Sequence, residues 1–360
     1  MKKQYYLYIF IGTIVIVLGL LIYGCQKSST QTNNNTFMEL SPTTITEQNQ
    51  LQINQILDEN IFFPNINSAN NIIFLADQGK YIYEFNPTTN KQQKKFDEEI
   101  LGIYSAIYSP SGNSLYIMSN YPKKNIKLYQ LNQKNISSLN EKIQNIVWQP
   151  NSEKIIYSFL ENESIDDVSH TINASNPNGE NWQIIKKVNT SPERSIFLNS
   201  DNENIYYNVQ PTDFRGSDLI KLNTSTRDEK IIAQDSLYIS FSPDKQKIII
   251  EKITNVEKGK SKYILIDNNG TENNRVKIDN FYIDKIVWSK DSKFIYQLYD
   301  TQALEKIHTE TGEKQIYQIF INPDIKDYNQ PINVSNLMIT TDNKTIYFTS
   351  NNKLYSINLP

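Results

Sequence analysis

The sequence predicts an all-β protein, a seven-bladed β-propeller built from four-stranded antiparallel blades. The first observation is a short pattern that occurs seven times: an apolar run, a polar turn and a second apolar run. The second is its spacing, because successive turns follow one another after 40 to 51 residues, which is typical of propeller blades and not of helical solenoids. The seven copies occupy residues 66–72, 109–115, 149–155, 199–205, 242–248, 289–295 and 340–346.

Each copy is predicted to be a β-hairpin that forms the first two strands of a blade. In the fifth copy, residues 238–242 alternate between apolar and polar, and Ile248 to Ile250 follow the turn. Pro243 presets a turn dihedral, and the side chain of Asp244 can bond back to the chain. Alternation that is interrupted by such residues is the sequence signature of two antiparallel strands.

Further strands follow most hairpins and complete the predicted blades. Third strands are expected at residues 80–85, 127–131, 218–222, 262–266, 315–319 and 354–359. Shorter and more polar fourth strands are expected at residues 182–188, 229–233 and 275–278. Four strands per repeat make one propeller blade.

The turns resemble the repeats of TolB-like propellers, also described as WD40-like repeats. That resemblance is carried by Phe241-Ser242-Pro243-Asp244, Trp288-Ser289-Lys290-Asp291 and Tyr108-Ser109-Pro110-Ser111-Gly112. It covers about residues 61–360 and implies a propeller architecture and no particular activity. TolB carries a separate domain ahead of its propeller, and the polar stretch before residue 51 is too short to be one, so the resemblance implies a relative in fold.

The last repeat lacks residues for an outer strand, since the chain ends after residues 354–359. An open propeller would leave an unpaired strand edge. Residues 51–57 alternate apolar with polar just before the first blade. We therefore expect residues 51–57 to pair beside residues 354–359 and close the ring, within a propeller domain of residues 51–360.

The N-terminus predicts a tether to a membrane. Lys2 and Lys3 precede an apolar stretch over residues 5–24, which is long enough to span a bilayer as a helix with its positive end in the cytoplasm. Cys25 follows Gly24, and this context resembles the lipobox of bacterial lipoproteins. Residues 1–25 are thus either a lipoprotein signal peptide, with Cys25 as the lipidated residue, or an uncleaved anchor. Both place the remaining chain on the extracytoplasmic face of the cell membrane.

Composition limits the partners and stabilising bonds of the domain. Residues 26–50 are rich in Ser, Thr, Asn and Gln, which is typical of a flexible linker. Cys25 is the single cysteine, so the propeller has no intramolecular disulfide. The formal charge of −3 does not favour nucleic acid, which binds basic surfaces.

No catalytic or metal-binding motif stands out in the sequence. His170 and His308 are the two histidines, and neither belongs to a spaced set of metal ligands. Glycine loops for phosphates, nucleophile elbows and dinucleotide fingerprints do not occur. The sequence therefore predicts no cofactor, no metal and no catalytic residue.

Long connections between second and third strands are the better pointer to function, because binding residues concentrate on loops of rigid scaffolds. Tyr121, Phe214 and Arg215 lie in such connections, and exposed aromatic residues and Arg are favoured contact residues. The leading hypothesis is a tethered binding module for an envelope protein or glycan. The alternatives are a propeller hydrolase or lyase acting on an envelope polymer through Asp166, Asp167 or Asp300, and a purely structural envelope protein.

Overall fold

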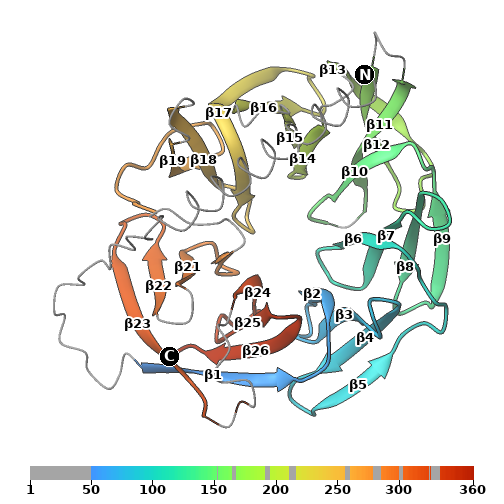
Figure 1. Ribbon diagram of the computed structural model, residues 1–360. Coiled ribbons are helices and arrows are strands. Elements are labelled where there is room, and N and C mark those ends of the chain that lie inside the picture. Colours follow the sequence, from blue (N-terminus) through green and yellow to red (C-terminus); the bar gives the residue numbers. More distant parts are fainter. Residues whose placement is uncertain are drawn as a thin grey trace, which may run out of the picture. The chain divides into compact units, whose positions relative to one another are not determined.

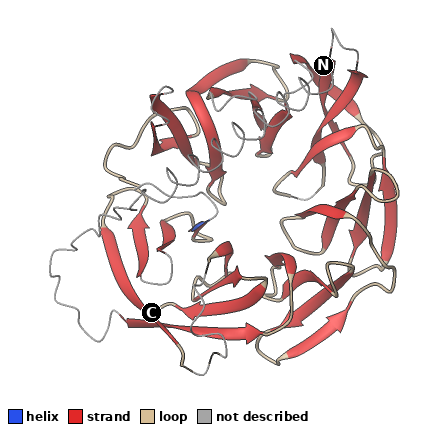
Figure 2. Ribbon diagram, in the orientation of Figure 1, coloured by secondary structure: helices blue, strands red, loops and turns tan. Residues whose placement is uncertain are grey.

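The computed structural model describes residues 50–151, 153–163, 168–190, 195–210, 216–255, 260–278, 285–299, 303–323, 325 and 333–360. All of them belong to the compact unit Glu47–Pro360. The regular elements of this part are β-strands (Figure 2), and none of its helices is long and apolar enough to cross a membrane. The signal peptide or anchor helix, Cys25 and the linker, all predicted within residues 1–50, lie outside the described residues apart from Gln50.

Three sheets consist of four consecutive antiparallel strands each. The first contains β2 (Phe62–Ile66), β3 (Ile72–Ala76), β4 (Tyr81–Asn86) and β5 (Lys91–Lys94). The second contains β6 (Ile103–Tyr108), β7 (Ser114–Ser119), β8 (Asn125–Gln130) and β9 (Asn135–Leu139). The third contains β10 (Ile143–Trp148), β11 (Ile155–Glu163), β12 (Val168–Ser175) and β13 (Gln183–Thr190).

Two larger sheets contain the remaining strands. A six-stranded sheet runs in chain order through β14 (Ser195–Ser200), β15 (Asn204–Gln210), β16 (Ser217–Asn223), β17 (Glu229–Phe241), β18 (Lys247–Asn255) and β19 (Lys260–Asp267). An eight-stranded sheet has the order β20-β21-β22-β23-β1-β26-β25-β24. Its strands are β1 (Gln50–Leu57), β20 (Ile286–Trp288), β21 (Phe294–Tyr299), β22 (Ala303–His308), β23 (Lys314–Ile321), β24 (Ser335–Ile339), β25 (Thr345–Ser350) and β26 (Lys353–Asn358).

The sheets stand around a common centre, which makes this unit a β-propeller (Figure 1). The first strands of neighbouring sheets lie against one another near the centre: β2 against β6, β6 against β10, and β10 against β14. β24 lies against both β20 and β2. The C-terminal strands therefore meet the first sheet of the chain.

The predicted division into seven separate four-stranded blades is wrong. The described strands form five hydrogen-bonded sheets, and three of these have four strands. One reason is β17, which the sequence divides into strands at residues 229–233 and 238–242. No turn separates them, and Ser236 pairs with both Ser217 of β16 and Lys252 of β18. One 13-residue strand thus belongs to both halves of the six-stranded sheet.

β1 is the reason for the eight-stranded sheet. It contains the segment that was expected to close the ring. Ile53 pairs with Ile357 of β26 in antiparallel orientation, while Leu51 pairs with Ile319 of β23 in parallel orientation. The N-terminal strand therefore satisfies the backbone of two strands that would otherwise have open edges.

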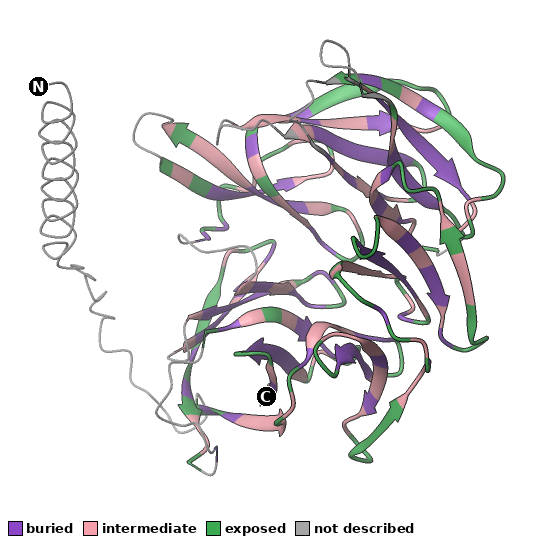
Figure 3. Cartoon of the chain, turned by 45° about the vertical axis from the view of Figure 1, so that its right-hand side comes forward, coloured by how far each residue is buried: buried purple, intermediate pink, exposed green. Residues whose placement is uncertain are grey.

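Both faces of the inner strands are buried, which explains their continuous apolar runs. In β3, Ile72 and Phe74 pack in one cluster with Met338, whereas Ile73 and Leu75 pack in another with Leu115. Side chains alternate across a strand, so each such strand contributes to two clusters between sheets. Buried positions run through the inner strands, and outer strands such as β5 and β9 are more exposed (Figure 3).

Three of the repeated turns are held by a hydroxyl and a carboxylate two residues apart. Ser242 Oγ donates to Asp244 Oδ1 at 2.6 Å, and the same 2.6 Å bond recurs at Ser289 and Asp291 and at Thr340 and Asp342. The Thr340 hydroxyl and the Lys344 N–H hold the pKa of Asp342 below its usual value. A carboxylate stabilised in this way fixes each turn.

Hydrogen bonds also connect one turn to the next around the propeller. The backbone N–H of Asp244 donates to Ser292 Oγ at 3.1 Å, and that of Lys290 donates to Asn343 Oδ1 at 2.7 Å. The Thr341 N–H donates to Asn70 Oδ1 at 2.8 Å. This last bond joins the C-terminal sheet to the first sheet, so the turns help to hold the two ends of the chain together.

Candidate functional site

Of the three contact residues predicted from the sequence, the structure describes Tyr121. Tyr121 lies in the turn between β7 and β8, and its side chain is 62% exposed. Phe214 and Arg215 lie outside the described residues, as do Asp166, Asp167 and Asp300 of the enzymatic alternative. Among the described residues, the structure therefore places one of the three predicted contact residues, Tyr121.

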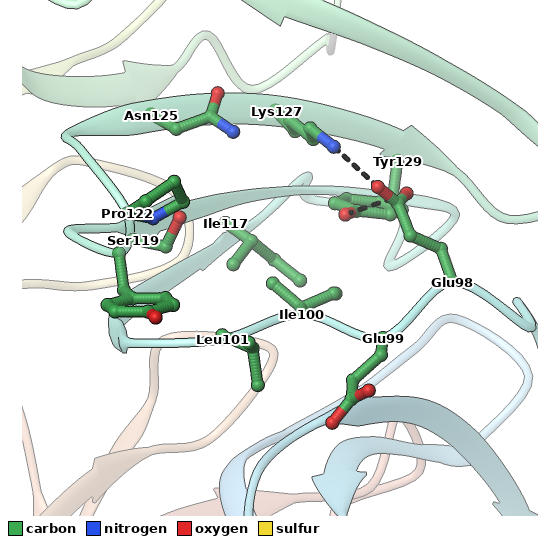
Figure 4. A pocket seen from close by; sticks show the side chains of 11 residues that line it. Glu98, Glu99, Ile100, Leu101, Ile117, Ser119, Pro122, Asn125, Lys127 and Tyr129 are labelled. Carbon is green, nitrogen blue, oxygen red and sulfur yellow. Dashed lines mark hydrogen bonds and ion pairs between the residues drawn. The ribbon is translucent and has the colours of Figure 1, made fainter.

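Tyr121 stands at a pocket of about 200 Å³, called here the Tyr121 pocket (Figure 4). Its walls come from β7, β8, the turn between them and the segment before β6. The lining residues are Glu98, Glu99, Ile100, Leu101, Ile117, Ser119, Tyr121, Pro122, Asn125, Lys127 and Tyr129.

Gly102 allows the segment before β6 to approach the turn that carries Tyr121. Its φ is +66°, and an added Cβ would lie 2.7 Å from both Asn120 Oδ1 and Tyr121 Cβ. The Asn120 N–H donates to the Gly102 carbonyl at 3.0 Å. A residue with a side chain at this position would clash with the turn in a conformation that favours glycine.

The charged groups of the Tyr121 pocket are paired within the protein. Lys127 Nζ lies 2.5 Å from Glu98 Oε1, and the Tyr129 hydroxyl donates to Glu98 Oε2 at 3.3 Å (Figure 4). Glu99 pairs with Lys80 at 2.7 Å. Burial, and secondarily the charge of Glu98, raises the pKa of Tyr129, so this phenol stays protonated at neutral pH. The Tyr121 pocket therefore combines paired charges with the exposed aromatic ring of Tyr121.

A larger pocket of about 440 Å³, called here the Trp182 pocket, lies between the second and third sheets. Sequence reasoning missed it, because Trp182 was interpreted only as the start of an outer strand. A tryptophan three residues after the polar turn Pro177-Asn178-Gly179 was the available signal. The lining residues are Ser138, Leu139, Asn140, Ile143, Tyr157, Phe159, Glu161, Thr171, Asn173, Asn178, Gly179, Glu180, Trp182 and Ile184.

The two pockets occupy equivalent places in neighbouring sheets. Ile117 of β7 pairs with Lys127 of β8, and Tyr157 of β11 pairs with Asn173 of β12. Each pair lines its pocket together with the segment that precedes the first strand of that sheet. Lys127 and Asn173 are therefore counterparts in the repeat.

The two histidines lie on different sheets and do not form a shared site. His170 is buried on β12, and burial lowers its pKa. His308 ends β22, where its Nδ1 accepts from the Glu310 N–H at 3.2 Å and its ring packs against Phe294. Among the described residues, no group of three His, Cys, Asp or Glu side chains could hold a metal ion.

Comparison with known proteins places the chain among β-propellers. No protein-family model matches it, and no curated protein matches its sequence, so membership of the TolB-like family has no support beyond the shared propeller fold. Oligogalacturonate lyase from Vibrio parahaemolyticus matches with a TM-score of 0.63 at 11% identity, over 86% of this chain and 93% of the lyase.

Two further solved structures show the same fold. An oligogalacturonate lyase in complex with manganese matches with a TM-score of 0.62 at 11% identity, over 86% of this chain and 93% of its own. The β-propeller domain of Cps50 (Swd1) from Myceliophteria thermophila matches with a TM-score of 0.54 at 8% identity, over 86% of this chain and 100% of its own. At these identities the likeness establishes the fold alone.

Proposed function

We propose that this protein is a membrane-tethered, extracytoplasmic propeller that binds an envelope protein through the surface around the Tyr121 pocket. The observation that carries the proposal is Tyr121 itself, a largely exposed aromatic ring at the mouth of a formed pocket. Loops on rigid scaffolds commonly carry binding residues, and exposed aromatic rings beside pockets are favoured anchors of protein interfaces.

The surroundings of Tyr121 favour a protein ligand with an apolar side chain. Leu101 and Tyr104 are large hydrophobic residues that are also exposed, and Leu101 lines the pocket. The charged side chains that line the pocket, Glu98, Glu99 and Lys127, are already paired with one another or with Lys80, so none of these described residues offers an unpaired charge to an ionic ligand. An apolar anchor inserted beside Tyr121 would remove these surfaces from water.

Site-specific photocrosslinking in intact cells tests the proposal. A photoreactive phenylalanine analogue replaces Tyr121 in the full chain, and a control variant carries it at Tyr238 of β17, which is similarly exposed. We expect a protein adduct of defined mass from position 121, absent from position 238 and reduced in the background of Leu101→Glu. Equal adducts from both positions, or none from position 121, would contradict the proposal.

The tether is the second part of the proposal, and we assign it to Cys25. The apolar stretch of residues 5–24 after Lys2 and Lys3 supports membrane targeting. We expect the wild-type protein to incorporate a labelled fatty acid and Cys25→Ser to lose the label. A membrane-bound but unlabelled wild type would instead point to residues 1–25 as an uncleaved anchor.

A lyase is the second candidate function, favoured by the structural likeness to oligogalacturonate lyase. It is tested directly by incubating the protein with oligogalacturonate, with and without manganese, and following the absorbance of unsaturated products. Product formation above a heat-denatured control would replace the binding module by an enzyme. A flat trace in both conditions would reject this activity.

A further inference from the structure

We propose that the Trp182 pocket is a second binding site, specific for a neutral oligosaccharide. The site goes beyond the proposed function and does not depend on the Tyr121 pocket. A sugar offers apolar C–H faces together with hydroxyl groups that donate and accept hydrogen bonds. The Trp182 pocket pairs an exposed aromatic wall with buried amide and hydroxyl groups, and its volume falls within the usual range of small-molecule sites.

Asn173 provides the polar floor of the pocket. Asn173 is 2% exposed. Its Nδ2 donates to Thr171 Oγ1 at 2.8 Å and to the Thr171 carbonyl at 3.4 Å. Because a carbonyl only accepts, these contacts orient the amide, and Oδ1 is left without a partner among the described residues. A buried acceptor without a donor is costly, and a ligand hydroxyl would satisfy it.

Two further amides face a ligand from the rim. Asn140 Oδ1 accepts from the Lys142 N–H at 2.9 Å, and Asn178 Oδ1 accepts from the Glu180 N–H at 3.1 Å. Both side chains are thereby held in place, while their Nδ2 groups have no acceptor among the described residues and can donate to sugar oxygens.

Trp182 and Ile184 form the apolar wall. Trp182 is 63% exposed and Ile184 is also exposed, and both line the pocket beside Phe159. An indole that lies open at a pocket offers a flat apolar face and a single N–H donor. This combination suits the C–H face of a sugar ring with a hydroxyl at its edge.

The turn before Trp182 is anchored to the neighbouring sheet, so the site is formed in advance. The buried Tyr116 of β7 donates its hydroxyl to the Pro177 carbonyl at 2.5 Å. Gly179 has a φ of +86°, and an added Cβ would lie 2.9 Å from Leu139 Cδ2. A site held in its binding geometry loses less entropy when a ligand binds.

The charges at the pocket select neutral sugars over uronates. Glu161 and Glu180 both line it, and among the described residues the ion pair of Glu161 is a long one, with Lys187 at 3.6 Å. Carboxylates accept hydrogen bonds from sugar hydroxyls, but they repel the carboxylates of a uronic acid chain. The proposed ligand class therefore differs from the oligogalacturonate named for the structurally similar lyase.

Tryptophan fluorescence reports on this site specifically. Of the three tryptophans, Trp148 is 9% and Trp288 is 6% exposed, so acrylamide quenching of the full chain reports mainly on Trp182. The probes are cellotriose, maltotriose and triacetylchitotriose as neutral trisaccharides, with trigalacturonate as the charged comparison. We expect at least one neutral probe to protect Trp182 from quenching and trigalacturonate to bind at least tenfold more weakly.

Variants separate this site from the Tyr121 pocket. By titration calorimetry, Trp182→Ala and Asn173→Ala should each weaken the protecting probe at least tenfold, whereas Tyr121→Ala should leave its affinity unchanged. Because Trp182 is largely exposed, its variant tests the site even if Asn173→Ala fails to fold. The inference is overturned if no neutral probe protects at about 10 mM, if trigalacturonate binds as tightly, or if Trp182→Ala retains full affinity.

Discussion

The Tyr121 pocket and the Trp182 pocket share one position of the repeat but differ in how their polar groups are satisfied. Lys127 in the first is paired with Glu98 at 2.5 Å, whereas its counterpart Asn173 in the second keeps an acceptor without a partner in the described residues. The backbone pairing is the same in both sheets. A repeated scaffold therefore supplies the cavity, and single side chains decide whether its polar groups are paired within the protein.

Exchanging the two counterparts tests the difference between the pockets most strongly, and Asn173→Lys should have the largest effect. The ammonium would replace an amide that is 2% exposed. The carboxylates that line this pocket are Glu161, which already pairs with Lys187 at 3.6 Å, and the exposed Glu180. Burying a charge without a well-placed partner is costly. We expect a loss of about 3 kcal/mol in the free energy of unfolding, measured by urea denaturation.

An unchanged urea midpoint for Asn173→Lys would show that the Trp182 pocket solvates a charge. That result would contradict the difference proposed between the two pockets. Asn178→Lys, at the exposed turn of the same pocket, is the matched control and should change stability little.

The reciprocal exchange, Lys127→Asn, should have a smaller effect. Lys127 and Glu98 are each partly exposed, and such pairs contribute about 1 kcal/mol or less. We expect a loss of that size at low salt that shrinks in about 1 M NaCl, since salt screens exposed charges. Lys94→Asn is the control, because Lys94 lies 3.9 Å from Asp97 in a looser pair. A salt-independent loss would mean that Lys127 acts through packing.

The smallest expected effect is a pH dependence of stability that arises from His170, which lies on β12 in the sheet of the Trp182 pocket. Burial lowers the pKa of His170 in the folded state below its ordinary value of 6.5. Folding therefore favours the neutral imidazole, so stability is fully present above pH 6.5 and is lost as the pH falls from there toward the folded-state pKa. We expect the thermal midpoint to fall over this interval.

His170→Gln should reduce this slope, because Gln does not titrate, while His308→Gln, at the end of β22 in another sheet, is the control. The melting temperature at several pH values between about 5 and 8 measures both. A slope that persists in His170→Gln would assign the pH dependence to other groups.

Most of the fold could be predicted from the sequence because the contacts within each repeat join residues that are close together in the chain. Turns such as Ser242-Pro243-Asp244 are held by bonds between near neighbours, including the 2.6 Å bond from Ser242 to Asp244, so their residue types predict them. Strand boundaries between repeats depend on pairing instead. Ser236 pairs with β16 on one side of β17 and with β18 on the other. The residue types at positions 234–237 do not predict that this strand is continuous.

The two pockets also differ in how far the sequence predicted their residues. Tyr121 could be found from the sequence because an aromatic residue in a long connection is conspicuous by itself. Asn173 could not, since a polar residue in a strand of alternating pattern gives no sign of which partners its side chain meets. Its open acceptor depends on Thr171 beside it and on the turn before Trp182, which Tyr116 of another sheet holds.

By itself, then, the sequence determined the all-β repeat, the hydrogen-bonded turns and the apolar strands that fill the core, because these follow from short-range periodicity and turn chemistry. The tertiary structure alone decided the sheet boundaries, the turn-to-turn bonds such as Thr341 to Asn70, and the different roles of Lys127 and Asn173. Those features depend on which distant residues the closed arrangement brings within hydrogen-bonding distance, and no local pattern encodes that choice.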